Sequence, residues 1–474
     1  MTVIASAPTV QALFAQQQAH AQQWRQSSLR ERKKLLQRFR EAILSHREII
    51  RQAVMADLGK PAAEADLSEV YPVVSEINHV ISHVDAWARP VKVDAPLTML
   101  GTRAEIRYEA KGVCLIIGPW NYPFMLALGP LVSCLAAGNT AILKPSEYTP
   151  KTSAVIAELV RSFFPRELVT VVEGGIEEST ALLRLPFDHI FFTGSPAVGK
   201  VVMRAAAENL TSVTLELGGK SPTIIDETAR LDDAVKRISY GKWLNNGQSC
   251  IAPDYLWVHE RVKDAFVQKL KETVVQQFGQ RTAITPQSPD YARVINDKNF
   301  QRLDQLLQEA VQRGATVEWN GPMDAGQRFF HPVILSGVPL EARIMQEEIF
   351  GPIMPILTYT DEDEAIRHIN AQPKALALYV FTTRKSFFEK VMAQTSSGTA
   401  CLNDCVLQFV HPNLPFGGVN NSGIGKAHGE AGFRAFSNEK SIVKQKNGFA
   451  SPYALYPPYN QRVRKVLDIL IKWF

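Results

Sequence analysis

Apolar and polar positions divide the chain into a helical N-terminal stretch and a longer stretch in which strands and helices alternate. Residues 9 to about 60 show helical periodicity, and further helix is expected to about Trp87. The start and stop signals are two capping-box pairs and a glycine-proline pair: Ser28 with Glu31, Ser45 with Glu48, and Gly59 with Pro61. Residues 93–107 then have extended character.

From Val113 onward, short apolar runs are separated by helical patterns. The predicted strands are 113–117, 140–143, 168–172, 189–192 and 213–215. The predicted helices between them are 123–137, 153–164, a short piece after Gly175, and 198–207. This alternation predicts a parallel, doubly wound sheet, in which ligands bind beyond the carboxyl ends of the strands.

The same alternation continues after residue 250 and predicts a second α/β domain. The strands expected there are 255–258, 333–335, 354–357 and 376–381. The helices expected there are 262–278, 299–313 and 362–370.

Composition fits a soluble globular protein and excludes several other classes. Of 474 residues, 46% are hydrophobic and 21% charged, and the net charge is +5. Five cysteines without regular spacing argue against a disulfide framework and for a reducing compartment. Residues 1–8 lack signal-peptide features, and no run reaches the roughly 18 apolar residues of a membrane span. The expected location is therefore cytoplasmic, and the basic cluster at residues 30–34 is interpreted as a solvated helix face rather than a nucleic-acid site.

Three polar residues stand in settings suited to chemistry. Cys250 lies in a loop of small polar residues, 245–253, where backbone dipoles are expected to lower its thiol pKa; a buried, inert cysteine is the alternative. Glu216 ends an apolar run and precedes Gly-Gly-Lys. Asn121 lies between two prolines after the first strand.

These residues carry a family resemblance. Asn121 in Gly-Pro-Trp-Asn-Tyr-Pro, Glu216 in Leu-Glu-Leu-Gly-Gly-Lys and Cys250 in Asn-Gly-Gln-Ser-Cys resemble the catalytic signatures of the NAD(P)-dependent aldehyde dehydrogenase superfamily. Further segments resemble family motifs in family order: 144–147, 192–199, 347–352 and 414–419. Tyr456-Pro-Pro-Tyr459 and the short N-terminus resemble the class 3 branch, which includes fatty, aromatic and coniferyl aldehyde dehydrogenases.

The resemblance implies an aldehyde dehydrogenase-like α/β architecture. Residues 1–84 and 108–215 would form the dinucleotide-binding domain and 216–424 the catalytic domain. Residues 85–107 and 425–450 would form a small β oligomerisation arm, in which 433–446 pair with the 93–107 segment, and this implies a homodimer. Residues 451–474 form an apolar tail.

The resemblance also implies roles in oxidising an aldehyde to the carboxylic acid. Cys250 would add to the aldehyde, giving a thiohemiacetal whose oxyanion is held by the Asn121 amide and the Cys250 N–H. Hydride loss would leave a thioester, and Glu216 would activate the water that hydrolyses it. The substrate expected is a medium or long aliphatic, or an aromatic, aldehyde.

The implied cofactor is NAD or NADP. The usual G-x-G-x-x-G fingerprint is absent, and Gly194-x-x-x-x-Gly199 opens the helix after the fourth strand, where backbone N–H groups can hold a phosphate. Glu147 would repel a 2′-phosphate, yet class 3 relatives with the same Lys-Pro-Ser-Glu pattern accept NADP, so both cofactors stay open. The residues expected to bind the cofactor are Trp120, Lys144, Glu147, Gly194, Ser195, Val198, Gly199, Leu217, Glu348 and Phe350.

Alternatives remain open at this stage. An acylating dehydrogenase would pass the thioester to coenzyme A, and a cofactor-free cysteine hydrolase would need a histidine partner for Cys250. His79 and His83 have metal-ligand spacing, but a polar helix face explains both and no metal is expected. The apolar tail 462–474 either packs over its own protein or contacts a membrane surface, assisted by its basic residues.

Overall fold

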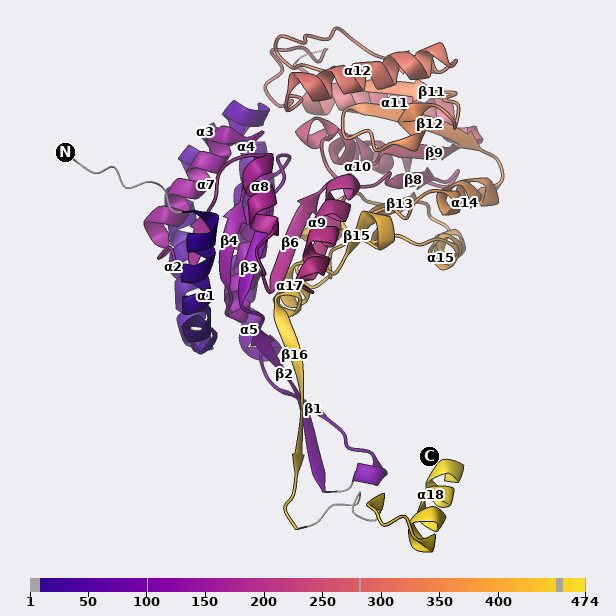
Figure 1. Cartoon of the computed structure of the whole chain (residues 1–474). Helices are drawn as coiled ribbons and strands as arrows, with labels where there is room; N and C mark the ends of the chain where they lie inside the picture. The colour runs from indigo at the N-terminus through magenta and orange to yellow at the C-terminus, as the bar shows by residue number, and fades with distance from the viewer. Residues whose placement is uncertain (1–8, 100, 281–282, 449–454, 474) are drawn as a thin grey trace, which may run out of the picture.

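The structure is a computed structural model that describes residues 9–99, 101–280, 283–448 and 455–473. Two α/β halves lie side by side, and a thin arm projects away from them (Figure 1). We call them the N-terminal half, built around strands β3 to β7, and the C-terminal half, built around strands β8 to β14. The expectation for residues 1–8 lies outside the described residues.

The N-terminal half is built on a six-stranded sheet in the order β15-β7-β6-β3-β4-β5. The strands are β3 (Val113–Ile117), β4 (Thr140–Lys144), β5 (Val169–Val171), β6 (His189–Gly194), β7 (Ser212–Leu217) and β15 (Gly423–Ile424). Strands β3 to β7 are parallel, and the short β15 runs antiparallel beside β7. The strand order reverses between β3 and β6, which is the point where doubly wound sheets open a ligand crevice. The predicted sheet is confirmed.

Helices surround this sheet and bury its apolar strands. Those before the sheet are α1 (Val10–Arg25), α2 (Leu29–Ser45), α3 (Arg47–Leu58), α4 (Ala62–Ala65), the π-helical turn η1 (Asp66–Val70) and α5 (Tyr71–Trp87). Those between or after its strands are α6 (Pro123–Ala137), α7 (Pro150–Phe163), α8 (Ile176–Leu183), α9 (Pro196–Glu208) and α17 (Gly429–Ala435).

Of the two predicted helix capping boxes, the structure contains one. The Ser28 capping box is confirmed, because Ser28 Oγ accepts from the Glu31 N–H at 3.3 Å and the Glu31 carboxylate accepts from the Ser28 N–H at 2.7 Å. The Ser45 capping box is wrong: Ser45 Oγ donates to the Ala42 carbonyl at 2.8 Å, and α3 begins after His46 without a side-chain cap. Ser45 is instead the last residue of α2, where its hydroxyl finds a carbonyl one turn back.

The C-terminal half has a seven-stranded sheet in the order β10-β11-β12-β9-β8-β13-β14, parallel except for β10. Its strands are β8 (Pro222–Ile225), β9 (Tyr255–His259), β10 (Thr316–Trp319), β11 (Val333–Ser336), β12 (Ile353–Tyr359), β13 (Ala377–Phe381) and β14 (Thr399–Leu402). Its helices are α10 (Leu231–Trp243), η3 (Leu244–Gly247), α11 (Glu260–Phe278), α12 (Asp297–Gln312), α13 (Arg343–Gln346), α14 (Glu362–Ala371), α15 (Lys385–Gln394) and α16 (Leu407–Val410). The one-turn helix η4 (Asn420–Ser422) leads into β15 and contacts β7 of the first sheet. The second α/β unit is confirmed, although the short strands β8, β10 and β14 were not predicted.

The arm is a three-stranded antiparallel sheet of order β1-β2-β16, with the one-turn helix η2 (Leu97–Met99) between β1 and β2. The strands are β1 (Val91–Val93), β2 (Thr102–Ala110) and β16 (Ser437–Gln445). Strand β16 pairs with β2 along its whole length, from Ser437 opposite Ala110 to Gln445 opposite Thr102. The predicted pairing of two segments far apart in the sequence is confirmed.

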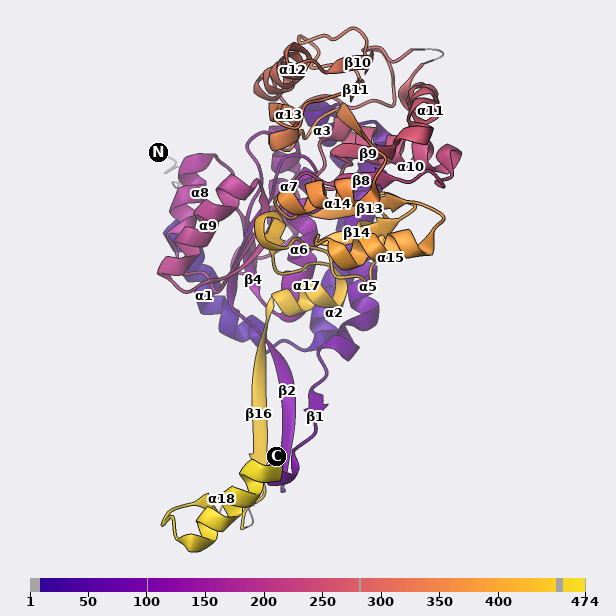
Figure 2. The same cartoon turned by 90° about the vertical axis from the view of Figure 1, so that its right-hand side faces the viewer.

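The C-terminal helix α18 (Gln461–Trp473) lies at the far end of the arm, away from both halves (Figures 1 and 2). Val463 is buried, whereas Ile471 is 81% and Trp473 72% exposed. The described residues therefore do not cover this apolar face, and the first alternative for the tail, packing over its own protein, is not what the structure shows. Among the described helices, none is long and apolar enough to cross a membrane.

Candidate active site

The loop before Cys250 turns through three consecutive left-handed residues. Asn245, Asn246 and Gly247 have φ angles of 52°, 56° and 74°. Asparagine and glycine enter this region at the lowest cost. A Cβ on Gly247 would also lie 2.4 Å from the Gly351 carbonyl oxygen. The Asn-Asn-Gly sequence is therefore what bends the chain sharply ahead of the thiol.

Asn121 follows β3, is buried, and is bound to the same loop. Its Nδ2 donates to the Gln248 carbonyl at 3.1 Å, and its own carbonyl accepts from Asn245 Nδ2 at 2.8 Å. The Asn245 backbone N–H in turn donates to a Glu64 carboxylate oxygen at 2.9 Å. An amide nitrogen carries two N–H donors. One can hold the loop while the other donates to a reacting oxygen.

A buried ion pair is hydrogen-bonded to the backbone of Asn121, and the sequence analysis did not predict it. Lys60 and Glu69 are fully buried, with Nζ and Oε1 2.7 Å apart. Lys60 Nζ also donates to the Asn121 carbonyl at 2.9 Å. The other oxygen of Glu69 accepts from the N–H groups of Phe124 and Met125, at 3.1 and 3.0 Å, in the first turn of α6. The pair thus fixes both the amide loop and the helix that follows it.

Glu216 and Cys250 line one cavity of about 400 Å³. Glu216 is 6% exposed, and among the described residues neither of its carboxylate oxygens has a hydrogen-bond partner. Burial raises the pKa of Glu216 well above its ordinary value, and Lys426 acts in the opposite direction. Glu216 is therefore a carboxyl group poised beside the thiol with free acceptor oxygens.

The Cys250 thiol does not have the lowered pKa that the sequence led us to expect. Burial is the largest cause that raises its pKa, followed by the carboxylates of Glu348 and Glu216. The backbone N–H groups of Cys250 and Ile251 lower the pKa but do not outweigh these causes. Burial favours the neutral form because a thiolate loses its hydration. In the protein without ligands, Cys250 is therefore a thiol.

Most of the cavity wall is apolar. Its apolar side chains include Leu67, Tyr71, Tyr122, Met125, Leu126, Phe191, Leu244, Val406, Leu407, Phe409, Val410 and Phe416. His428 also lines the cavity; burial lowers its pKa to about 4, and its ring stacks on Phe416 with centroids 5.4 Å apart. This wall suits a hydrophobic ligand beside the thiol.

Eight of the ten residues expected to bind a cofactor lie at or after the carboxyl ends of β3, β4, β6 and β7. Lys144 ends β4, is 2% exposed, and its Nζ lies 3.6 Å from the Glu147 carboxylate. Ser195 is the N-cap of α9, where its hydroxyl accepts from the Val198 N–H at 3.4 Å. Trp120 follows β3, so side chains from three neighbouring strand ends meet at the switch point of the sheet.

The two glycines of this segment have a packing role. A Cβ on Gly194 would lie 2.5 Å from the Phe192 ring, and a Cβ on Gly199 would lie 2.7 Å from the Leu217 side chain. Gly199 therefore lets α9 approach β7 closely. The N-terminal N–H groups of α9 lie where the sequence expects a phosphate.

Glu348 reaches across from the C-terminal half. Its Oε2 would lie 2.1 Å from a Cβ on Gly218, and burial raises its pKa to about 8. Its Oε1 has no hydrogen-bond partner among the described residues. Nearby, Phe350 meets the edge of Trp120 with ring centroids 5.3 Å apart. A free buried acceptor, a lysine and a helix N-terminus together fit the hydroxyl and phosphate groups of a dinucleotide.

No group of three or more potential metal ligands occurs in the described part of the chain. The rings of His79 and His83 on α5 are tilted to one another with centroids 4.2 Å apart, and His83 stacks on Trp87. These rings form an aromatic face of the helix.

Comparison with known proteins agrees with this geometry. The sequence model of the "Aldehyde dehydrogenase family" matches residues 3–442. The chain is 43% identical to the 4,4'-diaponeurosporen-aldehyde dehydrogenase of Staphylococcus aureus over 92% of this chain and 93% of the relative. It is 43% identical to mouse aldehyde dehydrogenase family 3 member A2 over 95% and 92%. Among solved structures, the substrate-bound state of Staphylococcus aureus AldH superposes with a TM-score of 0.93 at 40% identity, covering 98% of this chain and 100% of that one. The chain belongs to the aldehyde dehydrogenase family, in its class 3-like branch, and oxidises an aldehyde to the carboxylic acid with NAD or NADP.

Proposed function

We propose that Cys250, Asn121 and Glu216 carry out this oxidation, and that the substrate is a medium or long aliphatic, or an aromatic, aldehyde. The supporting observation is that Cys250 and Glu216 line one cavity while the Asn121 amide is hydrogen-bonded to the loop that carries Cys250. The apolar wall of that cavity supports the substrate class, because burying an apolar chain stabilises its binding by roughly 25 cal/mol per Å².

The Cys250 thiol gives up its proton to solvent as its sulfur adds to the aldehyde carbon, and Asn121 Nδ2 and the Cys250 N–H donate to the resulting oxyanion. NAD or NADP supplies the acceptor for the hydride that then leaves this carbon. The product is a thioester on Cys250. Glu216 takes a proton from the water that attacks the thioester carbonyl, and the acid leaves as the thiol re-forms. Because burial raises the pKa of Glu216, this group is a stronger base than an exposed carboxylate once it is ionised.

The cofactor is proposed to lie along the strand ends of the N-terminal half (residues 1–84 and 108–215), facing the catalytic domain (216–424). The residues proposed to hold it are Trp120, Lys144, Glu147, Gly194, Ser195, Val198, Gly199, Leu217, Glu348 and Phe350. Glu147 is 40% exposed and only loosely paired with Lys144. It is therefore free to accept a ribose hydroxyl, which favours NAD, and rates with both cofactors test this preference.

The decisive experiment compares Cys250→Ala with Glu216→Gln. Cys250→Ala is expected to abolish aldehyde-dependent NADH or NADPH formation. Glu216→Gln is expected to give a burst of about one equivalent per active site without turnover, because the thioester forms but is not hydrolysed. Stopped-flow absorbance of the reduced cofactor measures both.

Cys401→Ala is the matched control, since Cys401 is a half-buried thiol that does not line the cavity. Turnover by the Cys250 variant at the rate of this control would refute the assignment. If coenzyme A restores turnover to the Glu216→Gln variant and the product is an acyl-coenzyme A thioester, the acylating alternative is correct instead.

We further propose that the arm (residues 85–107 and 425–450) joins two copies into a homodimer. Strands β1 and β16 are the edges of its sheet, and Val91, Val93 and Val443 are 44%, 45% and 57% exposed. Exposed apolar edge strands are templates for pairing with another chain. Analytical ultracentrifugation should find a dimer that Val443→Asp weakens, and a monomeric wild type would contradict the proposal.

We also propose that α18 contacts a membrane surface. Its exposed apolar residues include Ile469, Ile471 and Trp473, and its basic residues are Arg462, Arg464, Lys465 and Lys472. A helix with such faces lies in the plane of an anionic membrane. Cosedimentation with vesicles that contain phosphatidylserine should be lost when Ile471 and Trp473 are replaced by serine. Equal binding of the wild type and this variant would contradict it.

A further inference from the structure

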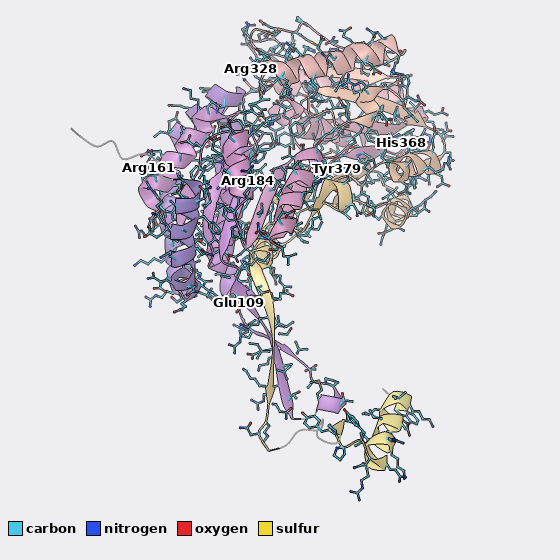
Figure 3. All side chains as sticks on the ribbon, in the orientation of Figure 1. Glu109, Arg161, Arg184, Arg328, His368 and Tyr379 are labelled. Carbon is cyan, nitrogen blue, oxygen red and sulfur yellow. The ribbon has the colours of Figure 1, made fainter. Side chains whose placement is uncertain are left out.

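Tyr379 lies in the middle of β13, fully buried, on the side of the C-terminal half that faces the N-terminal half (Figure 3). Its ring belongs to the apolar cluster that contains Ile251 and Cys405, and Cys250 and Val406 pack against the same cluster. Tyr379 therefore stands between the segment that carries the nucleophile and a wall of the substrate cavity.

The Tyr379 hydroxyl binds both segments. It donates to the Ile251 carbonyl at 2.7 Å, one residue after Cys250. It accepts from Gln408 Nε2 at 3.0 Å and from the Val406 N–H at 3.4 Å. A hydroxyl has one donor and two acceptor positions, and all three are used here. Burial raises the pKa of Tyr379 well above its ordinary value, so the hydroxyl keeps the proton that it donates.

The wall segment that Tyr379 holds is strained. Residues 405–407, 409 and 410 line the cavity. Val406 has a φ of 69°, which is an outlier for a β-branched side chain. Backbone strain of this kind persists only where surrounding contacts hold it, and it gathers at functional sites. The N–H of this same residue is one of the two donors to the Tyr379 hydroxyl.

We propose that Tyr379 is a positioning residue that ties the Cys250 loop to the cavity wall, so that one hydroxyl sets both the placement of the thiol and the selection of the aldehyde chain. The proposal deepens the function proposed above and rests on Cys250 as the nucleophile. It follows that removing this single oxygen changes thiol reactivity and chain-length preference together, although Tyr379 does not itself line the cavity.

The test is Tyr379→Phe, with two readouts. The first is the rate constant for alkylation of Cys250 by iodoacetamide, followed by peptide mass spectrometry. The second is the ratio of kcat/KM for decanal to that for propanal. Each is expected to change by about tenfold, because the Ile251 carbonyl and the Val406 N–H lose a buried partner. If either quantity stays within twofold of wild type, the proposal is overturned.

Tyr291→Phe is the matched control. Tyr291 is also buried, and its hydroxyl donates to the Phe330 carbonyl at 3.0 Å, outside the cavity lining. We expect a similar loss of thermal stability in both variants, with the alkylation rate and the selectivity ratio unchanged only in Tyr291→Phe. Equal changes in both variants would show a general loosening of the core and would overturn the proposal.

Gln408→Met keeps the test decisive if Tyr379→Phe does not fold. It removes one wall-side donor and leaves the bond between Tyr379 and Ile251, so the selectivity ratio should change while alkylation stays near the wild-type rate. An unchanged ratio overturns the proposal. The alkylation readout does not require Cys250 to be catalytic, whereas failure of the proposed function would appear as turnover by Cys250→Ala.

Discussion

At the scale of single residues, the site contains two kinds of buried ionisable group: one kind has an ion-pair partner and the other has none. Lys60 has Glu69 as its ion-pair partner, whereas Glu216 has no ion-pair partner within the described residues; burial raises its pKa and Lys426 lowers it. Breaking a buried pair is costly because it leaves one charge uncompensated. The Lys60 pair therefore belongs to the scaffold of the site, whereas the unpaired Glu216 is free to exchange protons.

Lys426 is expected to set the pH dependence of turnover. Its Nζ donates to the carbonyls of Gly398, Gly417 and Gly418, which holds it near Glu216. Burial raises the pKa of Glu216 and Lys426 lowers it, so Lys426→Met removes the opposing cause and the pKa rises further. Glu216 must be ionised to act as a base. The limb along which kcat increases with pH should therefore move to higher pH.

The measurement is kcat against pH, with the burst rate recorded in parallel, because hydride loss does not require Glu216. Lys426→Arg keeps the charge and should keep the wild-type profile. Lys440→Met removes an arm lysine whose partner is Glu109 and controls for net charge. A Lys426→Met profile that moves to lower pH would contradict the assigned direction.

At the scale of elements, the loop before Cys250 takes its shape from the left-handed backbone of residues 245–247. The substitution Gly247→Ala tests this. Gly247 and Gly337 have similar φ angles, 74° and 58°, but a Cβ would lie 2.4 Å from a backbone oxygen only at Gly247, whereas Gly337 has open space. Gly337→Ala should lower the free energy of unfolding by about 1–2 kcal/mol, because alanine is strained in the left-handed region. Gly247→Ala should lower the free energy of unfolding by about 1–3 kcal/mol more, because its Cβ would overlap the Gly351 carbonyl oxygen.

Urea unfolding of the two variants measures this difference, and kcat per folded molecule reports the loop. Gly247→Ala should also lose activity because the overlap displaces the chain three residues before Cys250. Equal destabilisation of the two variants, with full activity in both, would show that the loop tolerates another path.

At the scale of the whole molecule, the C-terminal half caps a helix of the N-terminal half. The Arg293 N–H donates to the Leu58 carbonyl at 2.8 Å, and Arg328 Nη1 donates to the Asp57 carbonyl at 3.1 Å and also binds the Ile295 carbonyl. Asp57 and Leu58 end α3, where helix carbonyls lack partners within the helix. Figure 3 shows Arg328 on the C-terminal half. These bonds fix the two halves relative to one another across the site.

Arg328→Met is expected to lower the free energy of unfolding by about 1.5–3 kcal/mol, the range for hydrogen bonds from a charged group. Arg161→Met is the control, since Arg161 is exposed and its one ion pair within the described residues is with Glu158, one turn away, an interaction worth about 0–1 kcal/mol. Differential scanning calorimetry compares them. A destabilisation no larger than that of the control would mean that the halves are held by other contacts.

Much of the fold could be predicted because the relevant signals are local. Apolar runs marked all five parallel strands of the first sheet, and four strands of the second, to within a few residues. The strand β8 was missed because it has only four residues and begins with Pro222, and a proline argues against a central strand when the sequence is read alone. The Ser45 capping box was wrong because a capping pattern fits any serine three residues before a glutamate, whether or not a helix starts there.

The sequence by itself determined most of the alternation of strands and helices, the polar loop around Cys250, and which residues could act as nucleophile, amide donor and base, because periodicity and motif chemistry reside in neighbouring residues. Only the tertiary structure decided which of these meet and how they are charged. Lys60 reaches Glu69 across nine positions and Asn121 across 61, and Tyr379 reaches Ile251 across 128. The raised pKa of the Cys250 thiol likewise comes from burial and from carboxylates on other strands and loops. Burial and contact between distant segments exist only in the folded chain, so no local pattern carries them.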